Sequence, residues 1–141
     1  MKRLIPATSY LIIAMRERWL TLILDGKKTA EVRRTHPARP CDIPDYLYLY
    51  HRGCIHGMVE VRAYRYLPCG WFSLSKGECQ EACLSGEAAR GYLQISSRGV
   101  IYKLGKVERF LKPIPVPCRP QSWQYATQEL LEIINGKGDQ Q

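Results

Sequence analysis

The most informative segment of the sequence runs from Gly26 to Arg33 and reads GKKTAEVR. Glycine readily adopts the left-handed backbone that ends a helix, so Gly26 is expected to turn the chain out of a helix and into a strand. Alternate side chains of a strand share one face, about 6.6–6.8 Å apart. Thr29, Glu31 and Arg33 therefore project from one face, with Lys28 at the junction. The pattern gathers an amine, a carboxylate and a guanidinium within the size of one nucleotide.

These three charged side chains have two interpretations. In the first, Lys28 and Arg33 hold a phosphate or polarise a carbonyl, while Glu31 accepts from an exocyclic amine or moves a proton. In the second, Glu31 pairs with Arg33 or Arg34 on a solvated strand face, as many surface charges do. Both interpretations stay open at the level of the sequence.

The sequence on either side predicts a small domain that is mostly β, with a few short helices. Residues 16–25 have the i, i+3, i+4 apolar spacing of a short helix, and residues 71–97 are expected to be helical and irregular. Prolines between 34 and 44 predict a loop. Gly105 is expected to mark a bulge or bend. The expected strands lie at 10–15, 29–33, 46–50, 58–66 and 99–110.

The last predicted element is a C-terminal helix over about 122–135, with an apolar stripe that begins at Trp123 and ends at Ile134. Residues 138–141 are expected to be disordered. We expect one domain over 1–141 with its core in about 10–125, folded as a small barrel or sandwich. In the strand over 58–66, Val59, Val61 and Ala63 are expected to face inward.

Composition narrows the class of partner. Lys and Arg number 21 against 13 Asp and Glu in 141 residues, which gives a formal net charge of +8. Such an excess favours polyanions, above all nucleic acid. The longest apolar run, 10–15, is far shorter than the roughly 20 residues that span a bilayer, so a cytoplasmic protein without a membrane partner is expected.

The six cysteines include no Cys-x-x-Cys pair, and reduced thiols are expected. His51, Cys54 and His56 come closest to a metal site. A zinc site usually has a fourth ligand and paired spacing, and neither is visible in the sequence. A turn that happens to be rich in His and Cys is therefore expected instead. No metal and no cofactor are predicted.

Two further groups are candidates for nucleic-acid contacts. Tyr46, Tyr48 and Tyr50 share one strand face, where they either stack on single-stranded bases or pack beneath a neighbouring helix. Arg34 and Arg39 lie in the basic loop and are candidates for contacts to phosphates.

Gly26, Lys28, Glu31 and Arg33 resemble the Gly-x-Lys-x-x-Glu-x-Arg signature of the ASCH family, a branch of the PUA-like superfamily. Residues from about 10 to 125 resemble the layout of that family. The resemblance implies a small PUA-like β-barrel with flanking short helices and a cleft that binds RNA or a modified nucleotide. Lys28, Glu31 and Arg33 would line that cleft, and Gly26 would shape its floor.

Some members of the family are enzymes, so a metal-independent hydrolase is the alternative function. Relatives that hydrolyse acylated cytidine use a Lys and a Thr three residues later, and Glu31 stands at that position here. Cleavage of single-stranded RNA is the other activity that the resemblance suggests. There Lys28 would stabilise charge on the phosphorane, Glu31 would handle protons, and Ser122 would supply a hydroxyl. Ser122 is alternatively the N-cap of the C-terminal helix.

Overall fold

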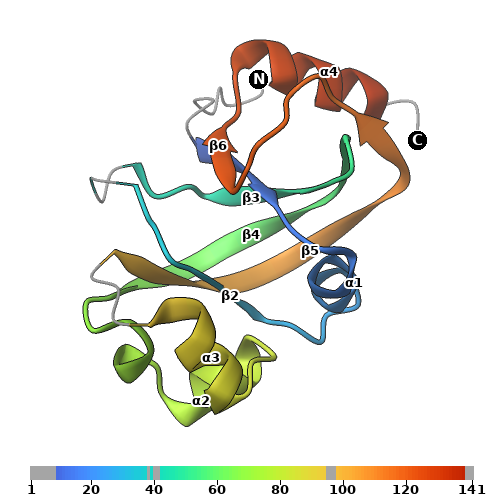
Figure 1. Ribbon diagram of the computed structural model, residues 1–141. Coiled ribbons are helices and arrows are strands. Elements are labelled where there is room, and N and C mark those ends of the chain that lie inside the picture. Colours follow the sequence, from blue (N-terminus) through green and yellow to red (C-terminus); the bar gives the residue numbers. More distant parts are fainter. Residues whose placement is uncertain (1–8, 38, 40–41, 95–97, 139–141) are drawn as a thin grey trace.

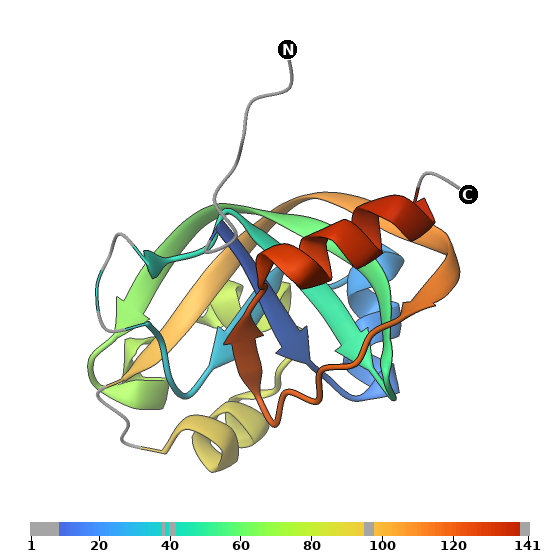
Figure 2. The ribbon, with the colours of Figure 1, turned by 90° about the horizontal axis from the view of Figure 1, so that it is seen from above.

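Six strands of the computed structural model form one mixed sheet that curves into a half-barrel (Figures 1 and 2). The structure describes residues 9–37, 39, 42–94 and 98–138. The strands are β1 (Tyr10–Ala14), β2 (Ala30–Arg33), β3 (Tyr46–His51), β4 (Cys54–Leu67), β5 (Gly99–Pro115) and β6 (Trp123–Tyr125). Their order across the sheet is β2-β5-β4-β3-β1-β6, in which β1 and β3 run parallel and the other neighbours antiparallel.

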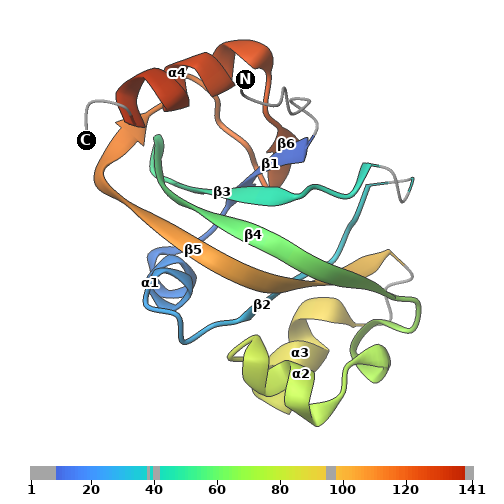
Figure 3. The same cartoon turned by 180° about the vertical axis from the view of Figure 1, so that it is seen from behind.

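Helices cover opposite ends of the half-barrel. They are α1 (Glu17–Leu24), the 3₁₀ helix η3 (Gly70–Ser73), α2 (Lys76–Glu81), α3 (Gly86–Leu93) and α4 (Gln128–Gly138). Figures 1 and 3 show α4 at one end, α2 and α3 at the other, and α1 beside β5. None of the helices in the described ranges has the length and apolar character that crossing a membrane requires.

Strand β3 is buried on both faces, and the two faces serve different parts of the core. Leu47 and Leu49 are fully buried in a cluster that includes residues of α1. Tyr48 and Tyr50 lie in a second cluster, against α4. The predicted separation of leucines and tyrosines onto opposite faces is confirmed.

The predicted helix over 122–135 is wrong in its first six residues. Trp123, Gln124 and Tyr125 form β6, where they pair with Ile13, Ile12 and Leu11 of β1. Helix α4 begins only at Gln128, after Thr127, whose hydroxyl accepts from the Leu130 amide at 3.1 Å. The predicted disordered tail lies outside the described residues, except that Gly138 is the last residue of α4.

The long hairpin of β4 and β5 contains irregularities that local alternation does not reveal. Val59 pairs with Val107 and Val61 with Leu104, so β5 carries an extra residue at Gly105 and the predicted bulge is confirmed. A second register shift follows between Val61 and Ala63.

The second shift changes which side chains of β4 face inward. Ala63 is exposed, and Tyr66, of the opposite parity, packs against the same cluster as Val59 and Val61, so the expectation that Ala63 faces inward is wrong. A bulge shifts the parity of a strand by one residue, which moves the following side chains to the opposite face.

Candidate functional site

The turn from α1 into β2 has the predicted geometry. Gly26 has a φ of +75°, and its amide donates to Ile23 O at 3.0 Å. The next two amides, of Lys27 and Lys28, both donate to Leu22 O at 2.9 Å. The left-handed glycine therefore ends the helix and places Lys28 directly before the strand.

Three charged side chains lie close together, one directly before β2 and two on it, and two of the three are buried. Lys28 is 3% exposed and Glu31 5% exposed. Lys28 Nζ lies 3.4 Å from Glu31 Oε1, and Arg33 Nη2 lies 3.1 Å from Glu31 Oε2. Glu31 does pair with Arg33, but the solvated strand face of the second interpretation is wrong, because the carboxylate is almost entirely buried. We call Lys28, Glu31 and Arg33 the charged triad.

Strand β2 is buried on both faces because helices cover its other side. Ala30 and Val32 lie in an apolar cluster with Ala82 and Leu93. The Thr29 amide donates to Glu81 O at 2.8 Å, which joins β2 to the end of α2. Helices α2 and α3 therefore cover the face of β2 that carries Ala30 and Val32.

Each cation of the triad is also held by groups from distant segments. Lys28 Nζ donates to Ala82 O at 2.5 Å and lies 4.9 Å from the centroid of the Trp19 ring. Arg33 Nη2 donates to Ala14 O at 2.7 Å. Arg33 Nε is buried without a hydrogen-bond partner. The triad therefore links β2 to α1, α2 and β1.

A pocket of about 530 Å³ opens beside the triad. Its size fits a small organic ligand, which pockets of roughly 300–1,000 Å³ accommodate. Four cationic side chains and one carboxylate lie in its wall, together with three aromatic rings. The charged, aromatic and histidine side chains of the wall are Arg16, Trp19, Lys28, Glu31, Arg33, Tyr50, His51, Arg52 and Tyr92.

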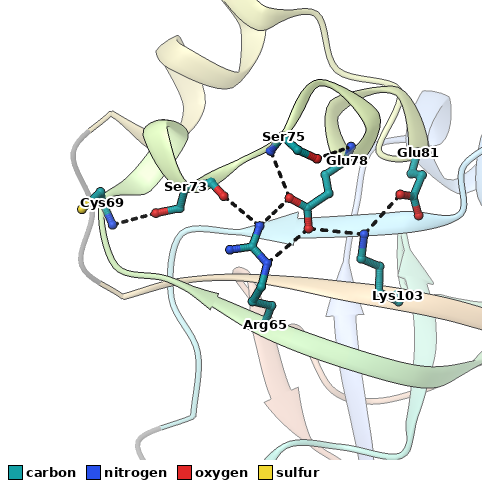
Figure 4. Close-up of polar contacts among 7 residues, drawn as sticks. All are labelled: Arg65, Cys69, Ser73, Ser75, Glu78, Glu81 and Lys103. Atoms are coloured by element: carbon teal, nitrogen blue, oxygen red, sulfur yellow. Dashed lines mark hydrogen bonds and ion pairs between the residues drawn. The ribbon is translucent and has the colours of Figure 1, made fainter.

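Helix α2 is fastened to the sheet by a second ion cluster (Figure 4). Glu78 forms ion pairs with Arg65 and with Lys103, the latter at 3.3 Å, and accepts from the Ser75 amide at 3.0 Å. Burial raises the pKa of Glu78, but the Ser75 amide and the two cations outweigh it and lower the pKa to about 2. This cluster holds the helix whose end supplies Ala82 O to Lys28.

The other residues predicted to contact nucleic acid lie at different distances from the pocket. The Arg34 guanidinium lies 5.3 Å from the centroid of the Tyr92 ring, which lines the pocket, but Arg34 itself does not line it. Arg39 pairs with Asp42 at 2.8 Å and does not line the pocket. Gly26 shapes the turn but does not line the pocket either, so its expected place in the floor is wrong.

Ser122 lies beside the triad and is not a helix N-cap. Its hydroxyl accepts from Arg33 Nη1 at 3.4 Å, and its carbonyl accepts from the Ala14 amide at 2.8 Å. The N-cap interpretation is wrong because the chain continues through β6 before α4 begins.

The predicted stacking of bases on Tyr48 is wrong because the ring is only 3% exposed. It stacks on Tyr10 with centroids 5.2 Å apart, and burial, followed by the nearby Tyr10 and Glu108, raises its pKa. Tyr50 is 8% exposed but lines the pocket. The alternative, in which these tyrosines pack beneath a helix, is correct for both.

Sequence reasoning missed several pocket residues. Trp19 and Tyr92 supply aromatic walls, and Arg16, His51 and Arg52 lie at the ends of β1 and β3. These residues lie far apart in the sequence, so no local pattern groups them. The available signals are the position of Arg16, two residues after the end of β1, and the basic turn that follows β3.

The His- and Cys-rich turn does not assemble a metal site. Among the described residues, no three His, Cys, Asp or Glu side chains are placed to hold a metal ion. His51 and His56 have ring centroids 6.0 Å apart, and His56 Nε2 lies 3.2 Å from the His51 carbonyl. The five described cysteines are free thiols, and Cys41 lies outside the described residues.

The chain is similar to known proteins in both sequence and fold. The family model described as ASCH domain matches residues 13–114, and no curated protein matches the chain. The crystal structure of ASCH from Zymomonas mobilis superposes with a TM-score of 0.76 at 19% identity, covering 92% of this chain and 95% of that chain. A serine-to-alanine variant of the same protein gives a TM-score of 0.78 at 19% identity, covering 94% and 99%. These structures confirm the predicted fold class, and since the family model covers well over half of the sequence, the chain belongs to the ASCH domain family.

Proposed function

We propose that the pocket beside the charged triad binds a nucleotide, either a modified nucleotide or one unit of single-stranded RNA. The observation that carries the proposal is the buried Glu31 carboxylate, held between Lys28 and Arg33 in the wall of a pocket of about 530 Å³. A carboxylate accepts hydrogen bonds and cannot donate them. With one ion pair on each oxygen, Glu31 keeps acceptor capacity for the amine of a base.

The remaining wall suits the other parts of a nucleotide. Trp19 and Tyr92 present aromatic surface, and base-aromatic stacking contributes about 1–3 kcal/mol per base. The excess of cations over carboxylates in the wall attracts phosphate. The net charge of +8 adds a long-range attraction for a polyanion.

The sharpest test replaces Glu31 by Gln. This substitution makes the pocket more positive, so non-specific attraction predicts tighter RNA binding. Recognition through the carboxylate predicts the opposite, a loss of about 10-fold or more, because a hydrogen bond to a charged group contributes about 1.5–3 kcal/mol. Fluorescence titration of short single-stranded RNA at two salt concentrations measures the difference.

The matched control is Glu132→Gln, an exposed carboxylate on α4 outside the pocket wall. It makes the same change of charge and should leave the affinity within about 2-fold of the wild type at moderate salt. The double variant Lys28→Ala, Arg33→Ala should lose at least 10-fold in affinity, provided its thermal unfolding remains cooperative. Absence of RNA binding at low salt, or Glu31→Gln binding as tightly as Glu132→Gln, would contradict the proposal.

A second candidate function is metal-independent hydrolysis, favoured by the Ser122 hydroxyl 3.4 Å from Arg33 Nη1. In this proposal Lys28 stabilises negative charge on a phosphodiester and Glu31 handles protons. Labelled single-stranded RNA and acylated cytidine, each incubated with chelator, test it. Turnover that falls at least 100-fold in Ser122→Ala supports it; no turnover, or full activity of that variant, contradicts it.

A further inference from the structure

The parallel pairing of β1 with β3 brings two arginines, Arg16 and Arg52, to the mouth of the pocket. Strands β1 and β3 are parallel neighbours, with Ala14 opposite Tyr50 at their ends. Carboxyl ends of parallel strands meet at one edge, where α/β proteins commonly bind ligands. Arg16 and Arg52 each follow two residues later, and both line the pocket.

The segments that carry these arginines are bonded to each other. The Met15 amide donates to Tyr50 O at 3.0 Å. His51 Nδ1 lies 2.9 Å from Met15 O, and because a carbonyl only accepts, Nδ1 carries the proton. The main chains before Arg16 and Arg52 are therefore held together, and His51 is a positioning residue.

Arg16 and Arg52 differ from the cations of the triad in their availability. Lys28 is buried and Arg33 is half-buried, and both donate to protein oxygens. Both mouth arginines are exposed, and in the part of the chain that the structure describes neither forms an ion pair. The planar guanidinium group of an exposed arginine presents several N–H donors that suit the oxygens of a phosphate.

The backbone at Arg52 is a further sign of a functional role. Arg52 and Gly53 have φ values of +48° and +82°, as in the two-residue hairpin turn that favours Asn-Gly. A non-glycine residue in this conformation costs about 1 kcal/mol or more, and Asn tolerates it better than Arg. Such strain accumulates at functional sites.

We propose that Arg16 and Arg52 form a phosphate subsite at the mouth of the pocket. This inference rests on the proposed function, in which the base of the nucleotide enters the pocket beside the triad. It narrows the ligand to a phosphorylated nucleotide, free or within a strand, and excludes the free nucleoside as the preferred ligand.

The test compares cytidine with cytidine 5′-monophosphate and 3′-monophosphate, titrated against the whole chain by NMR. Cytosine is chosen because its exocyclic amine can donate to a carboxylate. At least one monophosphate should bind 10-fold or more tightly than cytidine. Arg16→Ala and Arg52→Asn should each remove most of that difference and leave the affinity for cytidine within 2-fold.

The substitution Arg52→Asn separates binding from folding. Because Asn-Gly is favoured in this turn, the midpoint of thermal unfolding should stay the same or rise while the affinity for the monophosphate falls. The control is Arg62→Ala, an exposed arginine of β4 that does not line the pocket and should bind like the wild type.

The outcomes distinguish the two proposals. Equal affinity for cytidine and both monophosphates, or an equal loss for all three in Arg52→Asn, overturns the phosphate subsite and leaves nucleotide binding in place. If neither cytidine, the monophosphates nor single-stranded RNA bind, both proposals are overturned.

Discussion

The substitution Glu78→Gln tests how α2 is fastened to the sheet. Glu78 lies on α2, accepts from the Ser75 amide, and pairs with Arg65 and Lys103 (Figure 4). Gln keeps the length of the side chain and removes its charge. Lys103 keeps its ion pair with Glu81, at 3.2 Å, so the perturbation is confined to Glu78 and its contacts.

The magnitude follows from the pKa of Glu78, which falls on folding from 4.5 to about 2. This difference corresponds to about 3 kcal/mol at neutral pH. The Arg65 side chain is 46% exposed, and water screens its ion pair. We therefore expect a smaller loss in the free energy of unfolding, about 1–2 kcal/mol at pH 7.

The sign of the pH dependence is fixed by the lowered pKa. The stabilisation by Glu78 is complete above about pH 4.5 and disappears as the pH falls towards about 2, where the folded-state carboxyl is protonated. Urea unfolding of wild type and Glu78→Gln should differ by about 1–2 kcal/mol at pH 7 and converge towards pH 2.

Glu132→Gln on the exposed face of α4 serves as the control, expected within about 0.5 kcal/mol of the wild type at pH 7. A loss for Glu78→Gln below about 0.5 kcal/mol at pH 7 would refute the reasoning about charge. A loss that stays constant down to pH 2 would show that hydrogen bonding or packing, and not the charge, accounts for it.

Three further substitutions test the fold by thermal unfolding. Gly57→Ala should lower the free energy of unfolding by about 1–3 kcal/mol, since a Cβ there would lie 2.5 Å from Glu108 O. An unchanged midpoint of thermal unfolding would show that the hairpin moves to accommodate the Cβ. Thr127→Ala should cost about 1 kcal/mol by removing the bond to the Leu130 amide; Thr127→Ser should restore it. Tyr48→Ala should cost about 3–5 kcal/mol as a core truncation, whereas a loss of RNA affinity with no change in stability would restore the stacking role.

The elements set by local chemistry were predicted well. A left-handed glycine after an apolar i, i+3, i+4 stripe ends a helix wherever it occurs, and strand parity places Glu31 and Arg33 on one face without any tertiary contact. Strands β1 and β3 were also predicted correctly, because their apolar or alternating patterns are set by neighbouring residues in the chain.

Predictions about burial failed where distant segments intervene. The charges of β2 were compatible with a solvated face because the helices that cover this strand come about 50 residues later in the chain. Tyr48 was a candidate for base stacking because α4, which covers it, is separated from it by most of the sequence.

The C-terminal helix began too early in the prediction for a similar reason. The apolar spacing from Trp123 onward suits a helix, but three backbone pairs to β1 hold residues 123–125 as a strand. A three-residue strand has no pattern of its own that local reasoning can detect, because its hydrogen bonds all come from a partner elsewhere in the chain.

The family, the class of fold and the order of Lys28, Glu31 and Arg33 around a helix-to-strand turn follow from the sequence, because each depends on neighbours in the chain. The burial of Lys28 and Glu31, the pocket beside them and the meeting of Arg16 and Arg52 at its mouth arise only in the tertiary structure. The physical reason is the parallel pairing of β1 with β3, which joins segments 36 residues apart and leaves no periodic trace in the sequence.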